Sequence, residues 1–455
     1  MDLKHGLEKL ADRTSGPVFA SDDPAAVEEI APFNTALEQH PAVVVGAADA
    51  DDVRHAVQWA AEQDLAVAAQ ATGHGLYNPA DGGMVVSTRR MSTVRFDPVR
   101  NTATVGAGTR WDKVVSATQP FGWVPLCGTS FLVGAVGYTL GGGVGFLSRQ
   151  FGFGADQVER FSIVTADGQL RRVDADTEPD LFWAVRGGKG NFGIVTDIEF
   201  RLAPVTSVYG ATIYFAAESA AQVLHAYAEW APTMPANTST SIALLQLPPL
   251  PTLPEPIRGK RLIHLRYTYT GKAEEAEALL APMLQTGTIV FEQQGTMAFS
   301  ATDVIHRDPT APLPLFERST QLKTLGADTV DALLAAAGPD SDSRLLKVEL
   351  RQLGGALQEQ AAVPNAVAGR DGAYSLFILG ICAPGRREEL ENSAATILNA
   401  TAPWACSTTL ANFLGSATRP DQVRAAWQEP DRERLLAIKR TVDPQNMFQF
   451  GHALL

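Results

Sequence analysis

Residues 133–145 read Val-Gly-Ala-Val-Gly-Tyr-Thr-Leu-Gly-Gly-Gly-Val-Gly and contain six glycines. Each glycine loses more backbone entropy on folding than any other residue, so this density is too high for an ordinary strand or helix. Bare backbone lets a ligand come close, and successive N–H groups then turn toward phosphate oxygens without help from a lysine. The segment predicts a loop that holds a phosphate-bearing ligand, and a diphosphate is the group we expect.

Two better-known phosphate loops do not fit this chain. Lys189 in Gly187-Gly188-Lys189-Gly190 is followed by glycine, so the ending of a P-loop is missing. No glycine pattern opens a helix directly after the first predicted strand, as a dinucleotide-binding Rossmann unit requires. A glycine loop that serves tight packing alone stays open as the alternative interpretation.

Three further motifs stand in order around this loop. A strand over 42–45, a helix over 50–62 and a strand over 65–69 are predicted first, and the second strand leads into Gln70-Ala71-Thr72-Gly73-His74-Gly75. The second motif is Arg186-Gly187-Gly188-Lys189-Gly190-Asn191-Phe192-Gly193-Ile194-Val195-Thr196, and the third is Lys439-Arg440-Thr441-Val442-Asp443-Pro444-Gln445-Asn446-Met447-Phe448. With these motifs the chain resembles flavoprotein oxidases of the vanillyl-alcohol-oxidase type, in their berberine-bridge-enzyme-like branch. The resemblance runs from about residue 41 to 204 and returns at the closing motif.

The resemblance implies FAD as the cofactor. His74 matches the histidine that bonds covalently to the 8α-methyl of FAD in many members, and a histidine that only hydrogen-bonds backbone or phosphate is the alternative. Ser130 stands where other members have a cysteine that forms a second linkage, so the resemblance implies a single covalent bond. The cofactor-binding residues that it implies are Thr72, Gly73, His74, Gly75, Leu76, Thr129, Ser130, Gly134, Gly137, Tyr138, Gly141, Gly142, Gly143, Gly145, Asn191, Gly193, Val195, Asn446 and Phe448.

The group that removes a proton during oxidation is less well marked. Plant members of the family carry a carboxylate between a glycine pair and a later arginine, and here the stretch before Arg370 offers only Glu359 among neutral residues. Tyrosines are the next choice. We take Tyr138 in the glycine loop and Tyr374 after Arg370 as candidate catalytic residues, with an ordinary buried aromatic as the alternative for each.

The sequence predicts an α+β fold. Residues 1–205 and 410–455 are expected to form a two-subdomain FAD-binding domain of the vanillyl-alcohol-oxidase type, and residues 206–409 an α+β substrate domain. In the second domain, periodicity predicts strands over 208–215, 241–247, 261–270, 345–353 and 373–381, and helices over 220–230 and 274–284. The resemblance implies that this domain places an antiparallel sheet over the flavin.

Two of these strands have one polar face. A period of two puts His264, Arg266 and Thr268 on one side of their strand. The same spacing puts Lys347, Glu349 and Arg351 together on another, and we call these two rows the polar faces. A polar face lines a site or faces solvent, and we expect solvent for each individual side chain.

The composition of the chain limits the classes of partner that it is expected to bind. The chain has 455 residues and a formal net charge of −13, which argues against nucleic acid and anionic membranes. Its three cysteines, Cys127, Cys382 and Cys406, are scattered and odd in number, so neither a disulfide framework nor a metal site is predicted. The N-terminal residues lack signal-peptide character, which favours a cytoplasmic location. No pattern indicates an oligomeric state.

Three functions follow from the resemblance. The leading hypothesis is an FAD-dependent oxidase that takes hydride from an alcohol, amine or phenolic small molecule resembling secondary metabolites, with O₂ as acceptor and H₂O₂ as product. The alternatives are a flavin-dependent dehydrogenase or oxidative cyclase that reacts poorly with O₂, and a non-catalytic flavin-binding relative. The intact glycine motifs and His74 favour an active enzyme.

Overall fold

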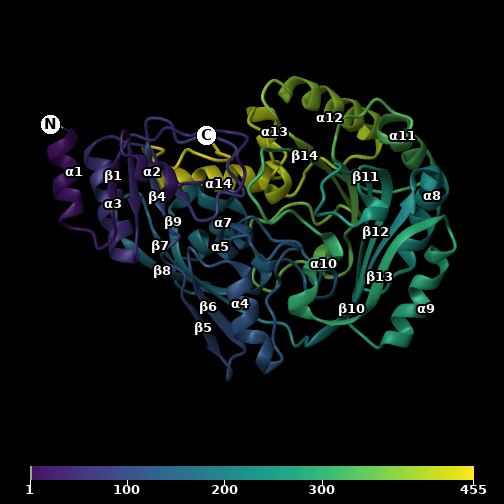
Figure 1. Ribbon diagram of the computed structural model, residues 1–455. Helices are drawn as coiled ribbons and strands as arrows, with labels where there is room; N and C mark the ends of the chain where they lie inside the picture. Colours follow the sequence, from purple (N-terminus) through teal and green to yellow (C-terminus); the bar gives the residue numbers. More distant parts are fainter. Residues whose placement is uncertain (1–2) are drawn as a thin grey trace.

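The computed structural model describes residues 3–455, which form three β-sheets with helices packed around them (Figure 1). The first sheet has the strand order β1-β2-β4-β3, with parallel pairing of β4 to both β2 and β3. Its strands are β1 (Val18–Ala20), β2 (Val43–Gly46), β3 (Val67–Gln70) and β4 (Met84–Ser87). Three of its four strands are consecutive apolar residues or nearly so, as expected for a small sheet that is covered on both sides.

The second sheet is antiparallel, in the order β5-β6-β9-β7-β8. Its strands are β5 (Val94–Asp97), β6 (Thr102–Gly106), β7 (Val158–Val164), β8 (Leu170–Asp174) and β9 (Ile194–Arg201). The helices of this half are α1 (Leu3–Ala11), α2 (Pro24–Glu29), α3 (Ala50–Glu62), α4 (Trp111–Thr118), α5 (Ala135–Leu140), α6 (Ser148–Phe151) and α7 (Pro179–Gly188). Helix α3 has the predicted bounds, and its N-cap Asp49 accepts hydrogen bonds from the backbone N–H groups of Asp51 and Asp52.

The third sheet has seven antiparallel strands in the order β13-β10-β12-β11-β15-β16-β14. Its strands are β10 (Ser207–Ala216), β11 (Thr238–Gln246), β12 (Arg261–Tyr269), β13 (Ile289–Ala298), β14 (Leu315–Leu322), β15 (Lys347–Gln352) and β16 (Tyr374–Ile381). The helices of this part are α8 (Ala220–Trp230), α9 (Ala273–Leu284), α10 (Asp303–His306), α11 (Ala327–Ala337) and α12 (Arg387–Thr401). All five predicted strands and both predicted helices are present within a few residues, whereas β13, β14, α11 and α12 were not predicted.

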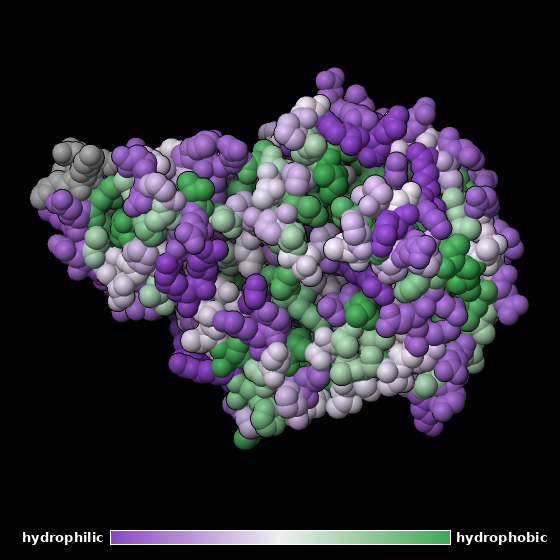
Figure 2. Space-filling model, viewed as in Figure 1, coloured by the Kyte–Doolittle hydropathy of each residue, from purple (hydrophilic) through white to green (hydrophobic). Residues whose placement is uncertain are grey.

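The two faces of the seven-stranded sheet differ in chemistry. Helices α8, α9, α11 and α12 cover one face, at the right of Figure 1, and share a core with residues such as Leu265, Val348 and Leu376. Over α11 and α12 the outer surface is mostly hydrophilic (Figure 2). The opposite face carries the polar faces identified above and turns toward the rest of the molecule. We call it the inner face.

The expectation that the polar faces meet solvent is wrong. His264, Arg266, Thr268 and Glu349 are each at most 3% exposed, and the side chains of Lys347 and Arg351 are only 14% and 12% exposed. A sheet between a helical layer and a second body has no solvated face, so its charged side chains must find partners inside the protein.

The end of the chain packs among the N-terminal elements. Helix α13 (Pro420–Arg424) precedes α14 (Glu429–Val442), which contacts α7 and appears in yellow beside the purple and teal elements of Figure 1. The Lys439 side chain is fully buried, and its Nζ donates to the carbonyl oxygens of Asn191 and Phe448 and to Asp443 Oδ2 at 2.5 Å. Asp443 in turn accepts from the backbone N–H groups of Met447 and Phe448. One buried ion pair thus fixes the closing motif to the loop at Asn191.

None of the helices in residues 3–455 has both the length and the apolar character that crossing a membrane requires.

We expect Lys439→Met to lower the free energy of unfolding by about 3–5 kcal/mol, because it leaves the buried Asp443 carboxylate without its cation. The matched control is Asp180→Asn, which breaks the exposed ion pair between Asp180 of α7 and Arg434 of α14 and should cost about 1 kcal/mol or less. Urea unfolding at a fixed FAD concentration measures both. Equal losses for the two variants would contradict the role given to Lys439.

Candidate functional site

A single cavity of about 500 Å³ joins the predicted flavin loops to the inner face of the seven-stranded sheet. Its walls come from the loop after β3, the start of α5, the turn after α7, the C-terminal tail and strands β14, β15 and β16. Segments that are far apart in the sequence therefore meet around one space.

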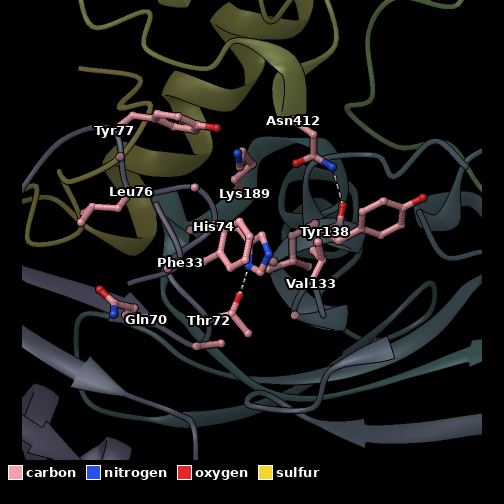
Figure 3. Close-up of a pocket in the computed structure, with 18 of the residues that line it drawn as sticks. Phe33, Gln70, Thr72, His74, Leu76, Tyr77, Val133, Tyr138, Lys189 and Asn412 are labelled. Carbon is pink, nitrogen blue, oxygen red and sulfur yellow. Dashed lines mark hydrogen bonds between the residues drawn. The ribbon is translucent and has the colours of Figure 1, made fainter. Parts of the chain in front are cut away.

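His74 lies in the wall of this cavity, on the loop that follows β3. Its ring stacks on Phe33 with centroids 4.0 Å apart, and its Nδ1 lies 2.8 Å from Thr72 Oγ1 (Figure 3). The other ring nitrogen, Nε2, is buried and has no hydrogen-bond partner within residues 3–455. Burial, with a smaller effect of Arg110, lowers the pKa of His74 to about 4. The imidazole is therefore neutral at neutral pH and keeps one nitrogen free.

The glycine loop divides into a cavity-facing part and a packing part. Gly134 caps the short helix α5, and it lines the cavity together with Gly137. A Cβ built on Gly137 meets no heavy atom within 4 Å, so bare backbone faces open space there. At Gly145, by contrast, a Cβ would overlap the carbonyl oxygen of Cys127. Close packing explains the later glycines, and ligand approach explains the earlier ones.

The structure brings most of the predicted cofactor-binding residues together. Those that line the cavity are Thr72, Gly73, His74, Gly75, Leu76, Thr129, Ser130, Gly134, Gly137, Tyr138, Asn191, Gly193, Val195 and Phe448. Those outside its lining are Gly141, Gly142, Gly143, Gly145 and Asn446. The Asn191 amide is engaged by the protein itself, since it donates to the carbonyls of Gly188 and His452 and accepts from the N–H of Leu454.

The two tyrosines chosen as catalytic candidates occupy different places. Tyr138 lines the cavity, but its ring is packed against Gly128 and Gly143, and its buried hydroxyl has no hydrogen-bond partner in the described chain. Burial holds the pKa of Tyr138 well above 10. Tyr374 does not line the cavity, and burial raises its pKa to about 12. Within residues 3–455, neither hydroxyl donates a hydrogen bond to an acceptor.

A different tyrosine has such an acceptor. Tyr77 lies three residues after His74, its side chain reaches across the cavity wall (Figure 3), and its hydroxyl donates a short hydrogen bond to Glu317 Oε2 on β14. Both residues line the cavity, and His452 stacks on the Tyr77 ring. Burial raises the pKa of Glu317, against the opposing effects of the Tyr77 hydrogen bond and of Lys347. Sequence reasoning missed this pair because β14 was not predicted.

The inner face adds a buried charge cluster to the cavity. Glu349 forms ion pairs with Arg266 at 3.3 Å, Lys347 at 3.3 Å and Arg351 at 3.1 Å. Burial alone would raise the pKa of Glu349, but these cations hold it well below 4.5. Asp308 lies 3.8 Å from Lys347 and accepts a hydrogen bond from Thr129 Oγ1. Despite burial, the Lys347 charge helps lower the Asp308 pKa to about 2.

Lys189 is a further cation in the wall that pattern analysis did not select. It sits in the turn after α7 with a left-handed φ of 58° and lines the cavity. Its side chain makes no hydrogen bond or ion pair within residues 3–455, and burial lowers its pKa to about 8. Its only sequence signal is its position between glycines.

These features fit a bound FAD. The space is continuous, bare backbone faces it at Gly137 and Gly190, and the buried His74 Nε2 lacks a partner. An extended cofactor with a polar diphosphate and a flat ring needs this combination of open backbone and aromatic or aliphatic walls.

Comparison with known proteins agrees with this fit. A family model described as an FAD binding domain matches residues 41–174. The uncharacterized FAD-linked oxidoreductase YgaK of Bacillus subtilis is 25% identical over 464 residues, which cover 97% of this chain and 97% of that protein. The structure of BBE-like 1 from Physcomitrella patens matches with a TM-score of 0.86 at 20% identity, over 99% of each chain. Glucooligosaccharide oxidase from Acremonium strictum, whose FAD is 6-S-cysteinyl and 8α-N1-histidyl, matches with a TM-score of 0.83 at 19% identity, over 100% of this chain and 99% of that one.

The protein is an FAD-dependent oxidoreductase. Its relatives are FAD-linked oxidoreductases and its fold matches that of BBE-like 1, so the resemblance drawn from its sequence motifs is confirmed. The predicted α+β fold class is confirmed as well. The proposed domain boundaries and the individual site residues stay predictions.

We expect Gly137→Leu to reduce the FAD content of purified protein severalfold, because a side chain at this position fills the cavity. Gly326→Leu is the matched control, since a Cβ at Gly326 also meets nothing within 4 Å but Gly326 is an exposed residue outside the cavity lining. The ratio of flavin absorbance to protein absorbance measures the effect, and thermal unfolding checks that both variants fold. Full FAD content in Gly137→Leu would contradict a flavin in this part of the cavity.

Proposed function

We propose that the protein is an oxidase that carries FAD on His74 and takes hydride from an alcohol, amine or phenolic small molecule, with O₂ as acceptor and H₂O₂ as product. The observation that carries the proposal is the single cavity that places His74 and a hydrogen-bonded tyrosine–glutamate pair in the walls of one space. FAD supplies the two-electron acceptor for hydride. The chain's residues supply attachment, orientation and proton removal.

The state of His74 supports covalent attachment. Thr72 Oγ1 holds Nδ1, and Nε2 is left as the free nitrogen of a neutral ring. We assign to His74 the role of holding FAD, through a bond that one of its ring nitrogens would make to the 8α-carbon of the cofactor. The Acremonium strictum oxidase carries an 8α-N1-histidyl FAD, which supports a histidyl linkage in this fold.

Proton removal is assigned to Tyr77 and Glu317. A substrate O–H or N–H would donate its proton to the Tyr77 hydroxyl while Tyr77 passes its own proton to Glu317 Oε2. The raised pKa of Glu317 makes it a better acceptor near neutral pH than Asp308 or Glu349, whose pKa values are lowered. Tyr138 and Tyr374 offer no such acceptor, and the geometry therefore favours Tyr77 over the two tyrosines chosen from the sequence.

The experiment that tests the function is anaerobic mixing with candidate alcohols, amines and phenols, followed by mixing with air-saturated buffer. Loss of the oxidised flavin spectrum, its rapid return with O₂ and formation of H₂O₂ in equal amount are expected. Slow return with O₂ would favour the dehydrogenase or cyclase alternative. A flavin that no substrate reduces would favour the non-catalytic one.

We expect wild-type protein to keep its flavin through acid denaturation and His74→Ala to release it completely. Thr72→Val should slow attachment several-fold, because Nδ1 loses the hydroxyl that fixes the ring, and Thr320→Val on β14, which lies outside the cavity lining, should leave attachment unchanged. Flavin fluorescence of the protein band on a denaturing gel, followed over time after FAD addition, measures this. Complete release from wild type would overturn the covalent bond while leaving the FAD site intact.

We expect Glu317→Gln to slow anaerobic flavin reduction about a hundredfold or more, the usual contribution of a general base. In wild type the reduction rate should fall as pH drops through a pKa above 4.5, because the acceptor must be ionised and its pKa is raised. That limb of the pH profile should disappear in Glu317→Gln. Tyr77→Phe should also be slow, whereas Tyr374→Phe is the control. An unchanged pH limb in Glu317→Gln would assign the proton to another group.

A further inference from the structure

We propose that the substrate is an aromatic compound that bears an oxyanion, a carboxylate or a phenolate, held between an aromatic wall and two cations of the inner face. The proposal rests on the proposed function, since it takes the end of the cavity at the seven-stranded sheet as the substrate site. It adds the chemical class of the ligand and names the residues that select it.

The first argument is charge balance. Arg266, Lys347 and Arg351 carry three positive charges around Glu349 and Asp308, which carry two negative charges. The histidines in contact with this cluster, His264 and His306, are neutral at neutral pH because burial lowers their pKa values well below 6.5. Glu317 interacts with Lys347 and Asp308 as well, so before proton transfer three cations face three carboxylates, in a place where Arg266 is 3% exposed and Glu349 is 1% exposed. Once Glu317 has taken up the substrate proton, one positive charge is in excess, and an oxyanion in the adjacent cavity would then stabilise the cluster.

The second argument is the hydrogen-bonding capacity that the two cavity-lining cations keep. Arg351 donates to Glu349 through Nε and Nη2, and within residues 3–455 its Nη1 has no partner. Lys347 Nζ lies 3.3 Å from Glu349 and 3.8 Å from Asp308 in ion pairs but makes no hydrogen bond in that part of the chain. Both side chains line the cavity and retain N–H donors for a ligand oxygen.

The third argument is the aromatic wall between them. Phe377 on β16 and Phe413 meet edge to face with centroids 5.5 Å apart, and both line the cavity. Lys347 Nζ lies 5.4 Å from the centre of the Phe377 ring, and Arg351 Cζ lies 5.9 Å from that of Phe413. Register explains the arrangement, because Glu349 pairs with Phe377 across β15 and β16, with Lys347 and Arg351 two residues to either side on the same face. A flat ring on the phenylalanines thus puts a substituent oxygen within reach of a cation.

The test is ligand binding to the FAD-loaded protein, which does not depend on turnover. Isothermal titration with benzoate, benzamide and acetate separates the contribution of the ligand's charge to affinity from that of its aromatic ring. Benzoate should bind at least about tenfold more tightly than benzamide, which lacks the charge. It should also bind at least about tenfold more tightly than acetate, which lacks the ring. Lys347→Met and Arg351→Met should each lower benzoate affinity about tenfold and leave benzamide affinity within about twofold. Phe377→Leu should weaken benzoate and benzamide equally, about three- to tenfold. 4-Nitrophenolate, measured beside benzoate, tells which oxyanion is preferred.

The matched control is Arg318→Met on β14. Arg318 is a largely buried arginine of the same sheet that pairs with Glu391 and does not line the cavity, so benzoate affinity should not change. If the same cations act on the cofactor instead, Lys347→Met and Arg351→Met would both shift the affinity of the oxidised flavin for sulfite. The ratio of benzoate affinity to benzamide affinity would then stay as in wild type. That result, or equal binding of benzoate and benzamide by wild type, would overturn the proposal. Benzoate-selective binding without any reducible substrate would support the ligand class while counting against the oxidase.

Discussion

Glu349 holds three cations on the face of the seven-stranded sheet opposite α8, α9, α11 and α12. The constraint behind this arrangement is desolvation. Once α8, α9, α11 and α12 occupy one face and the N-terminal half closes over the other, every polar side chain of β11, β12 and β15 must be satisfied without bulk water. A shared carboxylate solves the problem for Arg266, Lys347 and Arg351 at once, and it leaves two of these cations at the cavity. Cations that the fold has to bury thus lie where a ligand in the cavity can contact them.

The same constraint explains what could be predicted from the sequence. Helix α8 and strand β12 have strong apolar periodicity because their apolar faces meet in one core, so their bounds follow closely from the pattern. Strand β13 is an edge strand with half or more of its residues exposed, and its Glu292, Gln293 and Gln294 give no alternation. Strand β14 reads Leu-Phe-Glu-Arg-Ser-Thr-Gln-Leu, with five polar residues in its middle, and tertiary contacts satisfy some of them. Because β14 was not predicted, Glu317 was not identified as a candidate site residue.

Motif spacing predicted the cofactor side of the site better than the substrate side. The glycine loop and the His74 loop are continuous segments, and a backbone open to a ligand is visible in the residue types of such a segment. The substrate side is assembled from single residues of β14, β15 and β16 with the loop at Phe413, and no local pattern joins them. Alternation did place Lys347, Glu349 and Arg351 on one face. It could not tell a solvated face from a buried one, because both show the same period of two.

Three carboxylates around one cavity end up with different proton affinities because their surroundings differ. Burial acts on all three and by itself raises each pKa. Glu349 has three cations within 3.3 Å, and Asp308 has Lys347 and the Thr129 hydroxyl, so both stay ionised. Glu317 has only the neutral Tyr77 hydroxyl as a direct partner, and burial prevails. Glu317 and Lys347 pair with Leu379 from opposite sides of β16, so Lys347 acts on Glu317 across one strand, and its effect on the pKa is smaller than that of burial. An enzyme that must both hold an anion and accept a proton needs this separation, because a carboxylate tied to the cations would be too weak a base and a cation next to the base would lower its pKa.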